Sequence, residues 1–186
     1  MKVHALPFFA KSYHVVIADS RAQGRCYVIG WSDGGINGLL MAIRHPDKVK
    51  RLAVTGANLW PDTTAVNKVA YTWAMSMNAG LIKKNDTSFA GRTQRKLMRL
   101  LSYEPNISIS QLHTIGCPTL VIGGDHDVIL PQHTLLIAQN IPHAYCWILP
   151  NSGHSTPIFY KDDFNRTVQN FFTKPFRSFA GFMFFQ

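Results

Sequence analysis

The chain has 186 residues and a net charge of +9 at pH 7, and 46% of its residues are hydrophobic while 16% are charged. This composition excludes an intrinsically disordered chain, and the length suffices for one domain with a sizeable core. The sequence contains no internal repeat and no run of about 18 apolar residues of the kind that spans a membrane. We therefore expect residues 1–186 to form a single globular domain.

The basic charge raises the question of nucleic-acid binding, because 19 lysine and arginine residues stand against 10 acidic ones. The densest basic cluster falls in a segment that we expect to be helical and exposed: Lys83, Lys84, Arg92, Arg95, Lys96 and Arg99. No nucleic-acid recognition motif accompanies this cluster, and no aromatic stripe interleaves with it. A charge run of this kind usually marks a solvated face, so we predict no nucleic-acid partner.

The cysteine content and the first residues bear on the cellular compartment. Cys26, Cys117 and Cys146 form an odd set without a CxxC pair, which is typical of reduced thiols. The opening residues, 1–4, do not build a signal peptide. We predict a cytoplasmic protein.

Short apolar strands alternate with helices, which predicts an α/β fold whose mostly parallel sheet is covered by helices on both faces. In chain order, the expected elements are a helix over 6–10, strands over 15–18 and 27–29, a helix over 34–45, strands over 52–56 and 119–123, a helix over 131–140, a strand over 144–149 and a helix over 161–172. Only residues 19–26 join the first two strands, whereas neighbouring parallel strands need a crossover of about a dozen residues. Either those two strands are not neighbours or a crossover element is absent.

Two segments depart from this alternation. We expect residues 58–112 to form a helical cap inserted between two strands, with apolar residues on one helical face (Val66, Val69, Ala70, Trp73 and Met77) and in a second helical segment (Leu97, Leu100 and Leu101). We interpret these apolar stripes as packing surfaces rather than as a cofactor site. Residues 174–186 are rich in phenylalanine, and they either cover an edge or face of the sheet or form a disordered, associating tail.

The octet at 28–35, Val-Ile-Gly-Trp-Ser-Asp-Gly-Gly, carries the strongest chemical signal in the chain. It contains Gly30-x-Ser32-x-Gly34 between an apolar strand and an amphipathic helix, which is the pattern of a nucleophile elbow. We expect both glycines to be required because a side chain at either position would collide with the strand or the helix. Such a turn exposes the Ser32 hydroxyl and directs the backbone N–H of Asp33 to where an oxyanion would form.

A serine nucleophile needs a base, and the base needs a group that orients it. Functional groups gather beyond the carboxyl ends of parallel strands, so we examine the residues after each later strand. Asp127 follows the strand at 119–123, and His154 follows the strand at 144–149. The order Ser32, Asp127, His154 is that of α/β-hydrolase triads, which predicts Ser32 as nucleophile, Asp127 as acid and His154 as base.

Other residues compete for these roles. Asp125 lies in the same loop as Asp127, and loop aspartates often only cap turns. Of the other histidines, His45 and His143 each adjoin a proline at the end of an element, and His126 lies in the loop of the acid. None of these follows the last strand as His154 does.

Binding residues are less well defined by the sequence. The carboxylate of Asp33 is favoured at a helix N-terminus, or it faces the cleft and pairs with a cationic substrate group such as a primary amine. Several aromatic residues either line an apolar acyl pocket or pack within the cap: Trp31, Trp60, Tyr71, Trp73 and Phe89. We select Trp31, Asp33, Trp60 and Trp73 as candidate substrate-binding residues, and we predict no metal site and no cofactor.

The run 30–36 with the following His45-Pro46, the segment 117–127 and the segment 150–154 resemble the serine hydrolases of the α/β-hydrolase superfamily. The similarity is greatest to the branch of valacyclovir hydrolase and the biphenyl-hydrolase-like esterases, and residues 19–25 resemble a loop of that branch. The resemblance implies cofactor-free hydrolysis of a small carboxylic ester, or of a related thioester, lactone or amide, with Ser32, Asp127 and His154 as the triad.

The sequence departs from that family in two places. The family has a helix between the segment that resembles 19–25 and the elbow strand, whereas here residues 25–26 run almost directly into that strand. The family also has an early His-Gly loop that supplies a second oxyanion donor, and we find no such segment in this sequence. Losing one such donor costs about 2.7–4 kcal/mol of transition-state stabilisation. An alternative function is therefore a shortened, catalytically weak or inactive hydrolase-like domain that acts as a binding module.

Overall fold

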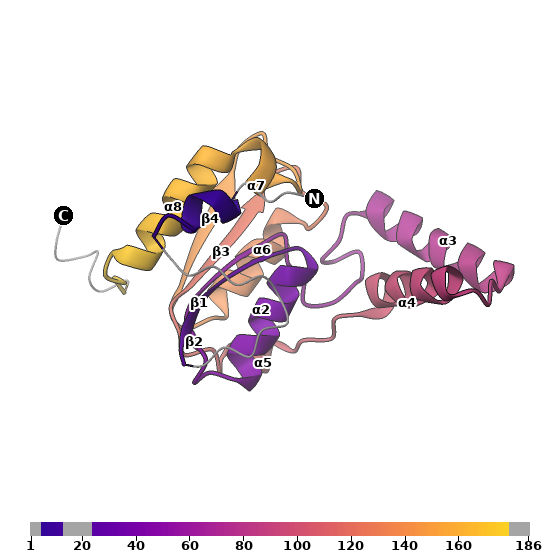
Figure 1. Cartoon of the computed structure of the whole chain (residues 1–186), viewed down its shortest axis with the longest axis horizontal. Helices are drawn as coiled ribbons and strands as arrows, with labels where there is room; N and C mark the ends of the chain where they lie inside the picture. The colour runs from indigo at the N-terminus through magenta and orange to yellow at the C-terminus, as the bar shows by residue number, and fades with distance from the viewer. Residues whose placement is uncertain (1–4, 13–23, 179–186) are drawn as a thin grey trace.

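The computed structural model describes residues 5–12 and 24–178, and its centre is a four-stranded parallel sheet (Figure 1). The strands lie in the order of the sequence: β1 (Cys26–Trp31), β2 (Val49–Thr55), β3 (Thr119–Gly124) and β4 (Ala144–Leu149). Every neighbouring pair is parallel. The predicted α/β class with a parallel sheet is therefore confirmed, and the strand predicted over 15–18 lies outside the described residues.

Helices cover both faces of this sheet. The first face carries α2 (Asp33–Arg44), α5 (Ile109–Leu112) and α6 (Pro131–Gln139), and the second carries α1 (Ala5–Phe9) and α8 (Lys161–Thr173) (Figure 1). The short helix α7 (Thr156–Phe159) directly precedes α8.

Side-chain alternation along the strands explains these two layers, since successive residues of a strand point to opposite faces. In β2, Leu52 and Val54 pack in the core under α2, whereas Ala53 packs with Phe164 of α8. The strands predicted over 27–29, 52–56, 119–123 and 144–149 are present, and β1 and β2 are longer than expected because their pairing continues through partly exposed residues.

Two short helices, α5 and α7, have no counterpart in the predicted element order. The start of α5 is signalled locally, because Ser108 and Gln111 form a reciprocal capping box. Serine followed three residues later by glutamine is a known signature of a helix start, so the start of α5 could have been predicted from the sequence.

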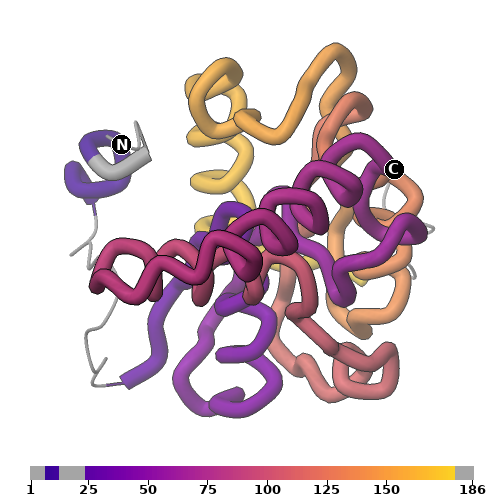
Figure 2. Tube along the Cα trace, turned by 90° about the vertical axis from the view of Figure 1, so that its right-hand side faces the viewer, coloured from indigo at the N-terminus to yellow at the C-terminus, as the bar shows by residue number. Residues whose placement is uncertain are grey.

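Between β2 and β3, α3 (Lys68–Lys84) and α4 (Phe89–Tyr103) form a helical hairpin that projects from the rest of the molecule (Figure 1). Viewed from a perpendicular direction, the two helices lie side by side (Figure 2). Asn67 caps α3 by accepting from Ala70 N–H, and Ser88 caps α4 by accepting from Gly91 N–H. The hairpin spans residues 68–103 within the predicted segment 58–112, whose last helix, α5, packs on the sheet instead, and the role of the hairpin as a cap stays a prediction.

The prediction that the apolar stripes of this hairpin are packed is wrong. Val69 is 82% exposed and Trp73 54% exposed on α3, and Leu97 is 58% exposed on α4. The helices instead pack on each other through small and polar groups, as where Ser102 Oγ donates to Ala74 O at 3.3 Å. The periodicity correctly indicated amphipathic helices, but a second apolar surface does not cover them in the described part of the chain.

The described part of the tail packs on the last strand. Phe176 stacks on Tyr145 of β4 with ring centroids 4.7 Å apart, and it also meets His143 edge to face. This arrangement agrees with the interpretation that the tail covers part of the sheet, although residues 179–186 lie outside the described residues. Within the described ranges, no helix combines the length and the apolar character needed to cross a membrane.

A buried histidine, His133 of α6, should make stability depend on pH. Its side chain is 2% exposed, and its Nε2 accepts the Leu59 N–H at 3.0 Å. Burial lowers the pKa of His133 to about 4, and the charge of Asp62 opposes this only in part. Since this folded-state pKa is below the value of about 6.5 in an unfolded chain, the unfolded state binds more protons between these pH values.

We therefore expect the free energy of unfolding to fall by about 3 kcal/mol through this group as pH drops from about 6.5 to about 4. Urea unfolding followed by circular dichroism across that range measures the slope, that is, how steeply the free energy of unfolding changes with pH. His133→Gln, whose amide oxygen can still accept the Leu59 N–H, should flatten it. His45→Gln is the control because His45 is exposed. An unchanged slope in His133→Gln would assign the pH dependence to other groups.

Candidate active site

The turn between β1 and α2 holds Ser32 in a backbone conformation that is uncommon for a residue with a side chain. Ser32 has φ 56° and ψ −122°, and its N–H donates to Thr55 O at 2.9 Å. Positive φ costs energy for non-glycine residues and persists only where the surrounding structure imposes it. Here the neighbouring strand β2 and the first turn of α2 fix the residue on both sides.

The glycines of this turn play different parts from those expected. A Cβ at Gly30 would lie 2.2 Å from Gly34 O, so Gly30 is required as predicted. A Cβ at Gly34 would meet nothing within 4 Å, so the predicted collision there is wrong. The crowded position is Gly35, where a Cβ would lie 3.0 Å from the Ala57 side chain. The second position of this turn that favours glycine is therefore Gly35, because α2 lies close to the segment after β2 there.

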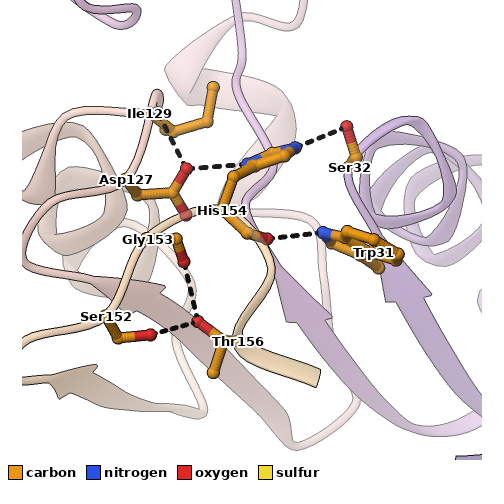
Figure 3. A network of polar contacts seen from close by, with 8 residues as sticks. All are labelled: Trp31, Ser32, Asp127, Ile129, Ser152, Gly153, His154 and Thr156. Carbon is orange, nitrogen blue, oxygen red and sulfur yellow. Dashed lines mark hydrogen bonds and ion pairs between the residues drawn. The ribbon is translucent and has the colours of Figure 1, made fainter. Parts of the chain in front are cut away.

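Three side chains from distant parts of the sequence form one hydrogen-bonded chain (Figure 3). His154 Nε2 lies 3.0 Å from Ser32 Oγ, and His154 Nδ1 lies 2.7 Å from Asp127 Oδ1. The Asp127 side chain is 1% exposed and that of His154 is 27% exposed. The buried carboxylate favours the tautomer with hydrogen on Nδ1, which leaves Nε2 free to accept the serine proton.

Backbone and side-chain contacts hold Asp127 and His154 in place. Asp127 Oδ1 also accepts the Ile129 N–H at 3.1 Å, which orients the carboxylate. The loop of His154 is anchored by Trp31, whose indole N–H donates to His154 O at 2.7 Å (Figure 3). Thr156 Oγ1 donates to Gly153 O at 3.0 Å within the same loop. Further hydrogen bonds therefore hold both the Asp127 carboxylate and the loop that carries His154.

The two candidate acids, Asp125 and Asp127, occupy different positions. Asp125 Oδ1 contacts His126 Nδ1 at 2.8 Å and accepts the Ser152 N–H at 3.0 Å. The hydrogen bond from His126, together with those from the backbone, lowers the pKa of Asp125 well below its usual range. Asp125 thus ties the two loops together, whereas Asp127 is the carboxylate that contacts His154.

Gly56 is a site residue that the sequence interpretation missed. It follows β2 with φ +61°, and a Cβ there would lie 2.8 Å from His154 Cε1 and 3.4 Å from Asp127 Oδ2. Asp127 Oδ2 has no hydrogen-bond partner within the described residues, and this glycine borders it. The sequence could have indicated this residue, because Gly56 ends the strand predicted over 52–56 and so lies at the same sheet edge as the other site residues.

A cavity of about 470 Å³ adjoins the serine and the histidine. Among the candidate binding residues, Asp33 and Trp73 line this cavity. Trp31 instead contacts the backbone of the His154 loop. Trp60 packs edge to face against His133, with ring centroids 4.8 Å apart. Most of the other lining residues come from the region after β2, from the hairpin and from the loop after Asp127. They include apolar and aromatic residues (Pro61, Val66, Val69, Ala70, Tyr71, Leu101 and Ile129) and the polar residues Asn58, Asn67, Ser102 and Glu104.

The wall of this cavity is mostly apolar, and Phe89 is not part of it, being 80% exposed at the start of α4. A cavity of this size and character suits a small organic ligand. Within the described ranges, no group of three or more histidine, cysteine, aspartate or glutamate side chains gathers in a way that could hold a metal ion.

The hydrogen-bonded chain of Ser32, His154 and Asp127 lies at the carboxyl ends of the parallel strands, where functional groups gather in α/β folds. The comparisons with known proteins agree with this fold class. No family model matches the chain. The chain is 26% identical to the mouse serine hydrolase BPHL over 157 residues, covering 77% of this chain and 53% of the relative. It is 29% identical to the 2-hydroxymuconate semialdehyde hydrolase of Pseudomonas putida over 176 residues, covering 77% and 61% respectively.

Solved structures show the same fold. The α/β hydrolase MGS-M2 from a deep-sea metagenome library matches with a TM-score of 0.64 at 18% identity, covering 84% of this chain and 68% of that one. The chain belongs to the α/β-hydrolase superfamily. It spans about half the length of BPHL, the first of these relatives.

Proposed function

We propose that this chain is a serine hydrolase that cleaves small carboxylic esters, or related thioesters, lactones or amides, through an acyl-enzyme. The observation that carries the proposal is the continuous chain from Ser32 Oγ through the His154 ring to Asp127, with 3.0 Å and 2.7 Å between the bonded atoms. The relatives named above support it, because both are called hydrolases.

In the proposed reaction, His154 Nε2 takes the proton of Ser32 Oγ as this oxygen bonds to the acyl carbon. Asp127 stabilises the imidazolium that forms. The imidazolium then gives its proton to the leaving alcohol, and the acyl group stays on Ser32. A water molecule, activated by the same imidazole, hydrolyses the acyl-enzyme and restores the serine hydroxyl.

Charge on the carbonyl oxygen needs a hydrogen-bond donor, and we assign one such donor to the backbone N–H of Asp33. As the first residue of α2, Asp33 has an N–H without an intrahelical acceptor. Asp33 lines the cavity, which supports the interpretation that its carboxylate pairs with a cationic group of the substrate. We assign Trp73 to the apolar wall for the acyl or alcohol group, and we propose no metal and no cofactor. The free thiols of Cys26, Cys117 and Cys146 support a cytoplasmic location as part of this proposal.

A fluorophosphonate probe tests the nucleophile directly, because it forms a stable phosphonyl adduct with an activated serine. We expect labelling of the full chain at one site, located to Ser32 by peptide mass spectrometry. Ser32→Ala should remove the label, and Ser110→Ala, which changes an exposed helix serine, should retain it. Labelling that persists in Ser32→Ala would contradict the proposed nucleophile.

The alternative function is a binding module with little or no turnover. The sequence leaves it open because residues 19–25 run almost directly into the elbow strand, where the family has a helix. Steady hydrolysis of p-nitrophenyl acetate separates the two functions. Turnover that Ser32→Ala abolishes supports the enzyme. Probe labelling without turnover supports a domain that keeps an activated serine but lacks the rest of the machinery.

A further inference from the structure

The helical hairpin carries an exposed apolar surface that the proposed chemistry does not explain. We define the hairpin surface as the exposed apolar side chains of α3 and α4, which are 41–82% exposed: Val69, Trp73, Met77, Ile82, Phe89, Leu97, Leu100 and Leu101. Single exposed apolar residues need no explanation, but eight of them on two packed helices are a concentration that usually marks an interaction site. Because the helices lie side by side, these residues share one projecting unit (Figure 2).

The helical repeat arranges the residues of α4 in two adjacent arcs. At about 100° per residue, Leu100, Leu97 and Leu101 lie about 20°, 80° and 120° around the axis from Phe89. The four basic residues of the same helix lie on the other side of Phe89, between about −20° and −120°: Arg92, Arg95, Lys96 and Arg99. An apolar arc of phenylalanine and leucine beside an arginine- and lysine-rich arc is the pattern of a helix that lies in a lipid–water interface.

The charge of the hairpin indicates the sign of its partner. Residues 68–103 contain seven lysines and arginines and one acidic residue, Asp86, which gives 7 − 1 = +6. Lys84 is 4.0 Å from Asp86, and the structure gives no other ion pair to these basic groups within the described residues. Two hairpins of this charge would repel each other, so the charge disfavours a second copy and favours an anionic surface.

We propose that the hairpin surface binds anionic phospholipid bilayers, with Phe89 and the leucines of α4 inserted at the interface and the basic arc among the headgroups. Lys96 and Arg99 line a groove together with Leu100, Tyr103 and Glu104, so this groove carries two cations and one carboxylate. Val69, Trp73 and Leu101 belong both to the hairpin surface and to the wall of the Ser32 cavity. A bound bilayer would therefore adjoin this cavity, and lipid-soluble substrates would reach it directly if the proposed hydrolase function holds.

Vesicle flotation with the full chain tests the proposal. We expect binding to phosphatidylcholine vesicles that contain about 30% phosphatidylserine, little binding to pure phosphatidylcholine, and a steep loss of affinity between about 0.05 M and 0.5 M salt. Phe89→Ser should weaken binding about tenfold. The double variant Lys96→Glu with Arg99→Glu should weaken it at least about thirtyfold.

Matched controls lie elsewhere on the same chain. Phe159 is 80% exposed, as Phe89 is, but it belongs to α7, so Phe159→Ser should bind as the wild type does. Lys161→Glu on α8 is the control for charge reversal. Ser32→Ala should also bind normally, so a failure of the hydrolase proposal and a failure of this one are distinguishable.

Three outcomes would overturn the proposal. The first is the absence of vesicle binding at low salt by a chain with a native circular dichroism spectrum. The second is concentration-dependent dimerisation, measured by sedimentation velocity and abolished by Phe89→Ser, in a chain that does not bind vesicles. The hairpin surface would then bind a second copy of the chain. The third is binding to soluble polyglutamate but not to vesicles, which would indicate an acidic protein partner.

Discussion

Removing the serine and the histidine together should cost no more turnover than removing either one, if they act as a single relay. We expect Ser32→Ala and His154→Ala each to lower kcat for p-nitrophenyl acetate by about a thousandfold or more, and the double variant to match the worse single variant. The reason is that the serine hydroxyl is a poor nucleophile without the imidazole 3.0 Å away. Initial rates at saturating substrate measure the effect.

The controls for this cycle are His45→Ala and Ser110→Ala, since both residues are exposed and lie outside the relay and its loops. Both variants should hydrolyse the ester at the wild-type rate. If the losses of Ser32→Ala and His154→Ala multiplied in the double variant, the two residues would act independently and the proposed mechanism would fail.

Adding one methyl group at Gly56 should disable the site while leaving the fold in place. In Gly56→Ala the new Cβ would lie 2.8 Å from His154 Cε1, inside any normal contact distance, so the imidazole must move away from Ser32 or Asp127. A displacement of about 1 Å costs about a hundredfold in rate, and we expect kcat to fall by at least that factor with little change in KM. The positive φ of this position adds about 1–2 kcal/mol of strain to the folded state.

Gly24→Ala is the matched control for Gly56→Ala. Gly24 also has a positive φ, +92°, but a Cβ there would meet nothing within 4 Å. Both variants should lose similar amounts of stability in urea unfolding, and only Gly56→Ala should lose kcat. Wild-type kcat in Gly56→Ala would show that the imidazole tolerates the methyl group and that Gly56 is not a positioning residue.

Much of the candidate site was accessible from the sequence because its parts follow local rules. A glycine-flanked serine between a strand and a helix indicates a sharp turn wherever it occurs. Asp127 and His154 could be selected because parallel strands bring their carboxyl ends to one edge, so residues far apart in sequence converge there. Chain order does not separate Asp127 from Asp125, because both lie between Ser32 and His154; the family resemblance favoured Asp127, and the structure brings Asp127 to the imidazole.

Other features depended on which surfaces meet. The identity of the crowded glycine, Gly35 rather than Gly34, is decided by the segment after β2, and the role of Gly56 by a histidine from the other end of the chain. The placement of Trp31 and Trp60 outside the cavity wall follows from the same kind of contact.

The amino-acid sequence by itself determined the order of the four described strands and of the longer helices between them, the serine turn, and the loops that carry the acid and the base, since periodicity and chain order encode them. The tertiary structure alone decided which apolar faces are covered. Periodicity reports that a helix has an apolar face, as on α3 and α4, but burial of that face depends on what packs against it. The exposed hairpin surface is thus a property of the assembled fold, in which the described residues bring no second apolar layer over these helices.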